Sequence, residues 1–271
     1  MAVTRTVPVL LYHSVCTDPA PLMREWAITP ARFREHLAFL NQRGYTTMTV
    51  SEYVDMLRFD LPLPEQVALV TFDDGFADFA SSAAPALADA GIASTIYIST
   101  AYVGGRSSWL GSDGEQPMMT WDAIEKIAAM GVEIGAHAHH HWALDELDDD
   151  SAEMEIGVSK KLLDRHLGRS VRSFAYPHGY HSRKIQAMVH RAGFDNACGV
   201  KEALSGPGDD EFALARIMLR GDASVEQLDS LMRGSSRAPR HERLQTKAWR
   251  VARRTRARLE LHKHADALDS A

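Results

Sequence analysis

Two adjacent carboxylates, Asp73 and Asp74, directly follow the apolar run Val67–Phe72 and precede Gly75. The apolar run predicts a buried strand. Carboxylates at the end of such a strand are costly to bury unless they are paired, protonated or bound to a metal. The pair is therefore a candidate for metal binding and for general acid–base work. The alternative is that Asp-Asp-Gly forms only a turn with a helix cap.

A second cluster lies at residues 137–141, where four histidines occupy five positions after the predicted strand Val132–Ile134. Imidazole suits a borderline metal ion such as Zn²⁺. His137 and His141 are four residues apart, so a helical turn would place both on one face. With one carboxylate they form an open site with positions for water and substrate. The two histidines between them are expected outside the ligand set, and a surface loop with incidental metal affinity is the alternative.

A third motif, Tyr176-Pro177-His178-Gly179, follows a short apolar run that begins at Phe174. Proline and glycine favour a tight loop here. The backbone N–H groups of such a loop can stabilise a developing oxyanion. Pro-x-Gly turns are common, so this motif gains weight only beside the other two.

Short apolar runs alternate with helical periodicity, which indicates parallel strands joined by crossover helices. We predict an α/β fold, a distorted (β/α) barrel of about seven parallel strands, with its site at the carboxyl ends of the strands. Residues 100–118 lack periodicity and are interpreted as a long functional loop. The expected strands are Val7–Tyr12, Val67–Phe72, Ile92–Ile98, Val132–Ile134, Phe174–Tyr176 and short segments at 196–200 and 214–219. The expected helices are Arg32–Gly44, a segment capped by Ser51, Phe76–Ala90, Thr120–Met130, a helix after Ser151 to about Leu167, and Arg183–Ala192.

The formal net charge of −6 is unevenly distributed along the chain. Residues 1–232 carry 19 Lys and Arg against 32 Asp and Glu, whereas residues 233–271 carry 11 against 4. We therefore predict a main domain over 1–232 and a basic linker with an amphipathic helical tail over 233–271. The acidic domain argues against nucleic-acid binding. The tail is expected to contact an anionic membrane surface or a glycosyltransferase, or else to be a solvated helix.

The cysteine content and the apolar segments bear on the compartment. Cys16 and Cys198 are too few for a disulfide framework, which favours a reducing compartment, although one bridge is possible in principle. No apolar stretch approaches the roughly 18 residues of a membrane span. The first apolar run is interrupted by Pro8 and His13, unlike a signal peptide. We expect a cytoplasmic protein, peripheral at the inner membrane face if the tail binds lipid.

The motifs Thr71-Phe72-Asp73-Asp74-Gly75 and His137-x-x-x-His141, in this order and about 60 residues apart, resemble the polysaccharide deacetylase family (the NodB-homology domain, carbohydrate esterase family 4). Leu11-Tyr12-His13-Ser14-Val15 and Ile28-Thr29-Pro30 are similar to the branch that deacetylates exported or lipid-linked poly-amino-sugars. The resemblance covers roughly residues 5–232. It implies a distorted (β/α) barrel and metal-dependent hydrolysis of an N-acetyl, N-formyl or O-acetyl group on a sugar.

The resemblance also implies roles for individual residues. It assigns Asp74, His137 and His141 to a divalent metal ion and Asp73 to the general base. Zinc is the default by ligand type, and Co²⁺, Ni²⁺ or Mn²⁺ fit the same ligands. The backbone N–H of His178 would bind the oxyanion. Because ligand imidazoles must be neutral, activity is expected to fall below about pH 6.

Two positions depart from the family pattern. The Arg that pairs with the base aspartate is replaced by Ala175, and the Leu-x-His motif that supplies the general acid is absent from Ile217–Asp222. Other residues must then fill these roles. Candidates for the acid are His13 or His178, and candidates for the partner of the base are Arg216 or Arg220. For His13, a structural role in a partly buried position is an equal alternative.

Substrate contacts are assigned to Tyr176, Pro177, Trp109 and Arg220. Trp109 and Trp142 offer ring faces for stacking on sugars, although a core role is as good an interpretation of Trp142. We predict removal of an acyl group from an amino sugar in a polysaccharide, a lipid-linked glycan or a sugar precursor. The alternative is a degenerate barrel that binds glycan or a partner protein without turnover, as the two departures would allow.

Overall fold

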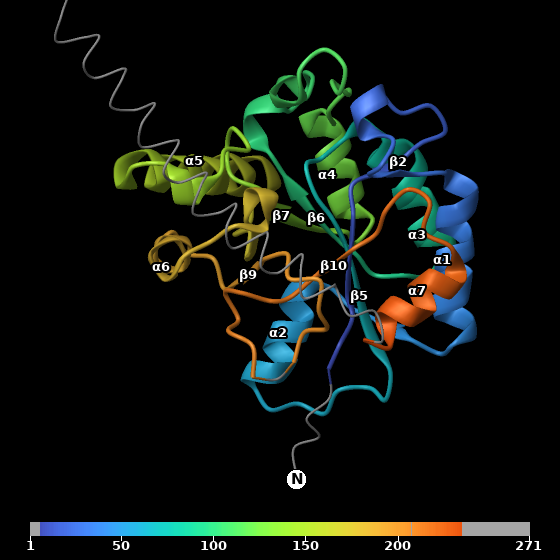
Figure 1. Ribbon diagram of the computed structural model, residues 1–271. Coiled ribbons are helices and arrows are strands. Elements are labelled where there is room, and N and C mark those ends of the chain that lie inside the picture. Colours follow the sequence, from blue (N-terminus) through green and yellow to red (C-terminus); the bar gives the residue numbers. More distant parts are fainter. Residues whose placement is uncertain (1–5, 207, 235–271) are drawn as a thin grey trace, which may run out of the picture.

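Seven parallel strands form a sheet that curls into a partial barrel (Figure 1). In chain order they are β1 (Val9–Tyr12), β5 (Val67–Phe72), β6 (Thr95–Ile98), β7 (Glu133–Ala136), β8 (Ser173–Ala175), β9 (Asn196–Cys198) and β10 (Ile217–Met218). They are hydrogen-bonded in the spatial order β10-β1-β5-β6-β7-β8-β9. The computed structural model describes residues 6–206 and 208–234. The predicted distorted (β/α) barrel is confirmed.

The segment before β10 connects β9 to β1 and so closes the barrel. Leu214 forms a parallel bridge with Cys198 of β9, and its backbone N–H donates to the Ala197 carbonyl at 3.0 Å. Three residues later, Ile217 of β10 pairs with Leu10 of β1. Arg216 lies between these two contacts, so its side chain enters the barrel from the closing segment.

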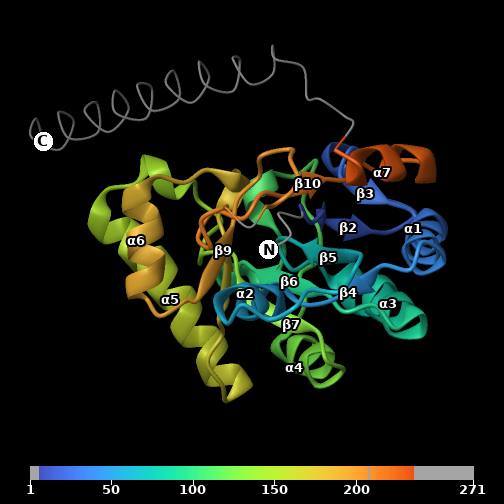
Figure 2. The same ribbon diagram turned by 90° about the horizontal axis from the view of Figure 1, so that it is seen from below.

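Helices surround the sheet, as Figure 2 shows from below. They are α1 (Pro30–Gln42), α2 (Val50–Arg58), α3 (Ala84–Ala90), α4 (Trp121–Ala129), α5 (Asp149–Leu167), α6 (Arg183–Arg191) and α7 (Val225–Met232). The short elements are β2 (Ser14–Val15), β3 (Ala27–Ile28) and β4 (Thr46–Thr47), a π-helical turn η2 (Phe79–Ala83), and the 3-10 turns η1 (Pro21–Met23), η3 (Thr100–Tyr102), η4 (Ser108–Leu110), η5 (Leu144–Glu146) and η6 (Pro177–Gly179). Among the described residues, no helix is long and apolar enough to cross a membrane.

The strands are buried on both faces. Every residue of β5 is buried, as expected for a parallel strand with packing on either side. The outward side chains, such as Val70 and Phe72, join the large cluster under the helices. The inward side chains, such as Leu69, form a smaller cluster inside the barrel with Val50 and Tyr53 of α2. Helix α2 therefore closes the amino-terminal end of the barrel (Figure 1), which leaves the carboxyl end for the site.

Two local predictions need correction. Thr49, rather than Ser51, caps α2, because Thr49 forms a reciprocal capping box with Glu52. Ser51 lies in the first turn, where its backbone N–H donates to Glu133. The segment predicted as one helix over Phe76–Ala90 contains the π-turn η2 before α3. Pro85 has no backbone N–H and favours this interruption of the regular ladder.

Other local expectations agree more closely. Thr120 caps α4 as expected, whereas α5 begins two residues before Ser151, with Asp148 as its cap. The sequence interpretation did not predict α7. The boundary after residue 232 stays a prediction, because the basic tail expected over 233–271 lies outside the described residues from 235 onward.

Candidate functional site

Asp74, His137 and His141 converge at the carboxyl ends of β5 and β7. One ligand atom from each lies within 4.8 Å of the others, and all three residues are buried. Asp74 Oδ1 is 3.4 Å from His137 Nε2 and 3.1 Å from His141 Nε2. Within the part of the chain that the structure describes, Asp74 Oδ1 has no hydrogen-bond partner. The sequence-predicted ligand set is thus brought together around one point.

The chemistry of this donor set fits a divalent cation. His137 Nδ1 is 2.8 Å from the Ala175 carbonyl, which can only accept, so the proton of the imidazole sits on Nδ1. The lone pair on Nε2 then faces the Asp74 carboxylate. Burial lowers the pKa of His137 to about 4, so the ring is neutral at pH 7. Two imidazole nitrogens and one carboxylate oxygen form a set that Zn²⁺ and related ions accept.

The turn after β5 directs the two aspartates. Asp74 has φ +75° and Gly75 has φ +93°, so two consecutive residues adopt left-handed conformations. Asp tolerates this region better than most residues, and Gly adopts it freely. The Gly75 N–H donates to the Asp73 carbonyl, and the Asp74 carbonyl accepts from Ser99 after β6. The Asp-Asp-Gly motif is therefore a turn, and it directs Asp74 toward the two histidines and Asp73 toward Arg216.

Asp73 is bound by Arg216. The guanidinium donates from Nη1 to Oδ1 at 2.6 Å and from Nη2 to Oδ2 at 2.7 Å, and both side chains are buried. Burial raises the pKa of Asp73, but the charge of Arg216 and its hydrogen bonds outweigh this effect and leave the pKa below its ordinary value. Asp73 Oδ2 is 3.8 Å from His137 Nε2. An ionised carboxylate thus lies beside the three ligand atoms, as a general base requires.

The loop that carries both histidine ligands is not the helical turn that their spacing suggested. Residues 137–141 contain no helix, and Ala138 and His141 have φ values of +58° and +60°. These left-handed residues reverse the chain so that both rings face Asp74. The two histidines between the ligands turn elsewhere: His139 Nδ1 contacts Thr100 Oγ1 at 2.8 Å, and His140 Nδ1 contacts Glu155 Oε1 at 2.6 Å.

His13 lies at the end of β1, next to the strand that carries Asp73. Tyr12 pairs with Phe72 of β5, and the Asp73 N–H donates to the Tyr12 carbonyl at 3.1 Å, so His13 and Asp73 follow neighbouring strand ends. Its Nδ1 is buried without a hydrogen-bond partner among the described residues, and its ring lies 5.8 Å from that of Trp26. Leu11-Tyr12-His13 itself has the Leu-x-His pattern. The pattern sought near β10 therefore occurs on β1, the strand paired with β10.

The third motif lies on the other side of the ligands. The ring of exposed His178, whose φ is +58°, is 4.7 Å from that of His141. Pro177 begins the turn η6. Tyr176 is fully buried, and its hydroxyl donates to the Phe212 carbonyl at 2.9 Å. Its side chain thus belongs to the core, so the predicted substrate contact of this motif remains a prediction for Pro177 and for backbone atoms.

The aromatic candidates differ in their distance from the ligands. Trp109 stacks on His141 with ring centroids 4.8 Å apart, which places it at the metal ligands. Trp142 is 45% exposed and stacks on His140. Arg220 forms an exposed ion pair with Glu25. Substrate contact by any of them stays a prediction, but Trp109 has the position that the role requires.

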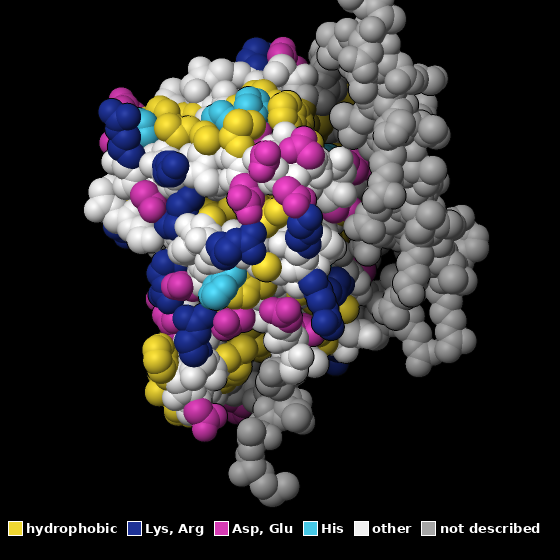
Figure 3. Space-filling view, turned by 90° about the vertical axis from the view of Figure 1, so that its left-hand side faces the viewer, with side chains coloured by type: hydrophobic (Ala, Val, Ile, Leu, Met, Phe, Trp, Pro, Cys, Tyr) yellow, Lys and Arg dark blue, Asp and Glu magenta, His cyan; other side chains and the backbone are white. Residues whose placement is uncertain are grey.

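Histidine and hydrophobic side chains are exposed near the carboxyl ends of the strands. In Figure 3, histidine and hydrophobic side chains form a band near the top of the molecule, above a face of mixed acidic and basic side chains. The carboxyl ends of the strands lie at this upper end in Figure 1.

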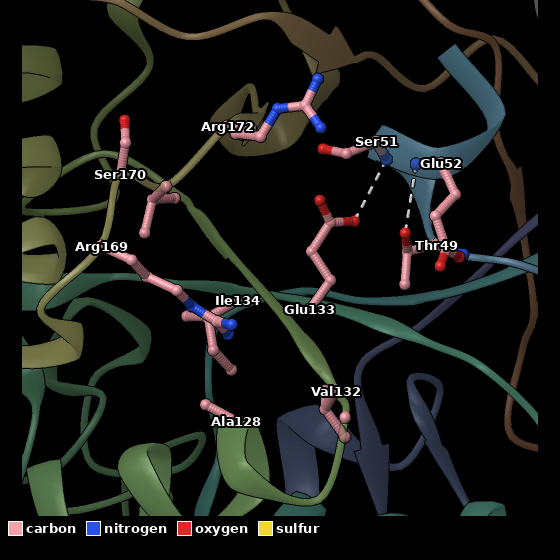
Figure 4. Close-up of a pocket in the computed structure, with 12 residues that line it drawn as sticks. Thr49, Ser51, Glu52, Ala128, Val132, Glu133, Ile134, Arg169, Ser170 and Arg172 are labelled. Atoms are coloured by element: carbon pink, nitrogen blue, oxygen red, sulfur yellow. Dashed lines mark hydrogen bonds between the residues drawn. The ribbon is translucent and has the colours of Figure 1, made fainter. Parts of the chain in front are cut away.

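A pocket of about 290 Å³ lies at the opposite end of the barrel (Figure 4). It is lined by residues from the start of α2 and β7 and from the segment before β8, including Arg169 and Arg172. Half-buried Glu133 accepts hydrogen bonds there from the Ser51 backbone and the Thr95 hydroxyl. The amino-terminal end of a parallel barrel usually serves stability, and none of the predicted site residues lines this pocket.

Comparisons with known proteins agree with this geometry. The family model for polysaccharide deacetylases matches residues 60–197. The chain is 26% identical over 211 residues to YxkH of Bacillus subtilis, a candidate polysaccharide deacetylase, covering 78% of this chain and 70% of that protein. It is 32% identical over 76 residues to the poly-beta-1,6-N-acetyl-D-glucosamine N-deacetylase of Escherichia coli K12, which is 28% of this chain but only 11% of that enzyme. The structure of the Streptococcus pyogenes deacetylase PplD in complex with acetate superposes with a TM-score of 0.74 at 22% identity, covering 85% of this chain and 99% of that one.

Proposed function

This chain belongs to the polysaccharide deacetylase family, and from that premise we propose that it is a metal-dependent hydrolase that removes an N-acetyl or related acyl group from an amino sugar. The observation that carries the proposal is the pairing of two different carboxylates. Asp74 faces two imidazole nitrogens, whereas Asp73 is held ionised by Arg216. One side chain is thus suited to hold a cation and its neighbour to accept a proton.

Asp74, His137 and His141 would hold the ion. A divalent ion bound there supplies Lewis-acid polarisation of the acyl group and lowers the pKa of a water molecule. Asp73 is the residue that takes the proton of the attacking water, since its carboxylate is ionised and fixed by two hydrogen bonds. The backbone N–H of His178 is our candidate for a hydrogen bond to the developing oxyanion.

The leaving amine needs a proton, and His13 is our candidate to supply it. It completes the Leu-x-His pattern on β1, beside the strand that carries Asp73. Base and acid would then approach the acyl group from neighbouring strand ends. His178 is the second candidate, because its ring lies beside His141. The alternative of a barrel without turnover is not favoured, since the ligand set and the paired base are both complete.

Metal analysis and acetate release test the proposal together. We expect about one divalent ion per purified chain and acetate release from oligomers of N-acetylglucosamine. His137→Ala should lose both the ion and the activity, and Asp73→Asn should keep the ion and lose the activity. His139→Ala is the matched control, because His139 is not a ligand. Full activity in the metal-free His137→Ala protein would overturn the proposal. A bound ion without acetate release from any acetylated sugar would favour the non-catalytic alternative.

A further inference from the structure

The loop at residues 137–141 carries two of the three candidate ligands in a conformation that its sequence does not favour. Ala138 and His141 both have positive φ values, and neither is glycine. L-residues avoid this region because Cβ approaches the following carbonyl. Such a conformation persists only when the surroundings determine it. The contacts of the loop therefore decide whether His137 and His141 face Asp74.

One side of the loop is held through its carbonyl groups. The Ala101 N–H donates to the His139 carbonyl at 2.9 Å, and the Tyr102 hydroxyl donates to the His140 carbonyl at 3.1 Å. Both donors belong to η3 after β6. The turn η3 therefore supplies hydrogen-bond donors to the carbonyl groups of His139 and His140.

The other side is held by a single carboxylate. Glu155 of α5 is fully buried. Its Oε2 accepts from the backbone N–H groups of His139 and His140, at 3.0 and 2.6 Å, and its Oε1 accepts from His140 Nδ1 at 2.6 Å. A carboxylate is costly to bury, and among the residues that the structure describes these three donors offset that cost. All three belong to the residues between the two ligands.

We propose that Glu155 is a positioning residue that holds the 137–141 loop in the geometry that binds the metal ion, acting through the backbone N–H groups of His139 and His140. This inference rests on the proposed function for the identity of the ligands. The hydrogen bonds of Glu155 go to His139 and His140, which lie between the two ligands in the chain. Its contribution is to keep two left-handed residues in place before the ion arrives, so that binding does not have to order the loop.

Zinc affinity measured without turnover tests this role. The metal-free protein competes with a chromophoric chelator for Zn²⁺, and Glu155→Met should weaken its affinity about tenfold or more, as losses of outer hydrogen bonds to metal sites do. Glu155→Gln should stay within about threefold of the wild type. Its amide oxygen can accept from both N–H groups, and its NH₂ can donate to His140 Nδ1 in the other tautomer. His140→Ala should also keep its affinity, because it retains the backbone N–H.

Glu153 supplies the matched control. It lies on the same helix and forms an exposed ion pair with Arg191, so Glu153→Met should leave zinc affinity unchanged. Folded Glu155→Met with wild-type affinity would overturn the proposal.

If Glu155→Met does not fold, hydrogen exchange of the metal-free wild type decides. The proposal requires slow exchange at the amides of His139 and His140, and rapid exchange there would refute it. Zinc affinity and hydrogen exchange are independent of acetate release. A failure of this inference can therefore be distinguished from a failure of the proposed function.

Discussion

Arg216 donates two parallel hydrogen bonds to Asp73, although the two residues are 143 positions apart in the chain. The guanidinium is also 5.4 Å from the Tyr97 ring, and its Nε donates to the Gly199 carbonyl at 3.0 Å. Arg216 thus reaches across the interior of the barrel from the closing segment. Of the two candidates for the missing partner of the base, the structure selects Arg216, since Arg220 pairs with Glu25.

The first prediction concerns this pair. Arg216→Lys should lower kcat about a hundredfold, because an ammonium group cannot reproduce the two-pronged contact that orients the base. Arg216→Met should also lower the free energy of unfolding by about 3–5 kcal/mol, because it leaves a buried carboxylate without its counter-charge. Steady-state kinetics and urea unfolding measure the two effects. Unchanged kcat in Arg216→Lys would contradict the assigned role.

An arginine placed on β8 should partly replace Arg216 as the partner of Asp73. Ala175, the position of the family arginine, lies in the same interior cluster as Tyr97. We expect Ala175→Arg combined with Arg216→Ala to recover part of the activity that Arg216→Ala loses. Ala175→Arg alone should destabilise the protein, since two guanidinium groups would then compete for one carboxylate. Absence of any recovery in a folded double variant would show that the position of Arg216 matters beyond its charge.

The second prediction separates the two candidates for the general acid. His13→Gln should reduce hydrolysis of an N-acetyl sugar about 10²–10³-fold. It should leave hydrolysis of an activated acetyl ester nearly unchanged, because that leaving group needs no proton. His178→Gln should affect both substrates alike. An equal loss on both substrates in His13→Gln would indicate a structural role, and selective loss in His178→Gln would assign the acid to His178.

The third prediction concerns Trp109. Its ring stacks on His141, and its Nε1 is buried without a hydrogen-bond partner among the described residues. If the indole contacts sugar, Trp109→Phe should raise KM about fivefold, as expected for the loss of about 1 kcal/mol of uniform binding, with kcat and zinc affinity unchanged. Kinetics with acetylated oligosaccharides and chelator competition measure both. A loss of zinc affinity with KM unchanged would instead make Trp109 a support for His141.

The positions of the strands could be predicted from the sequence, because an apolar run followed by a glycine-containing turn is recognised from neighbouring residues alone. Val67–Phe72 matches β5 residue for residue. Residue type and spacing predicted a site of two histidines and one carboxylate, and the family resemblance identified that carboxylate as Asp74. The helical turn expected for His137 and His141 was wrong, because the loop geometry depends on Glu155, whose contacts no spacing rule reports. The sequence also could not choose between Arg216 and Arg220 as the partner of Asp73. That contact depends on how the segment between β9 and β10 closes the barrel.

The third motif marks a different limit of sequence interpretation. Tyr176 was assigned to substrate by its place in the motif, yet its side chain packs in the core and bonds the Phe212 carbonyl. Alternation along a strand continues past its end, so neighbouring motif residues point in opposite directions. The Leu-x-His pattern at residues 11–13 was visible in the sequence, but its relevance depends on β1 lying beside β10.

The last prediction concerns the pH dependence of stability and involves a histidine away from the ligands. His36 of α1 is fully buried. Its Nε2 is 3.0 Å from the Ala223 carbonyl, and its Nδ1 is 3.0 Å from the Tyr12 hydroxyl. A carbonyl only accepts, so the proton sits on Nε2, and Nδ1 accepts from Tyr12. Burial lowers the pKa of His36 below its ordinary value of 6.5. The neutral ring is therefore the form that the fold holds.

The sign of the effect follows from proton binding. Below about pH 6.5 the unfolded chain protonates His36, whereas the folded protein does not until its lower pKa is reached. The unfolded state then binds more protons, so the free energy of unfolding should fall with decreasing pH, by at most about 1.4 kcal/mol per pH unit from this group. His36→Gln should lack this component. Urea unfolding of both proteins between pH 7.5 and 5.5, with EDTA present so that metal binding does not contribute, measures the difference in slope. Equal slopes would mean that His36 titrates normally in the folded protein.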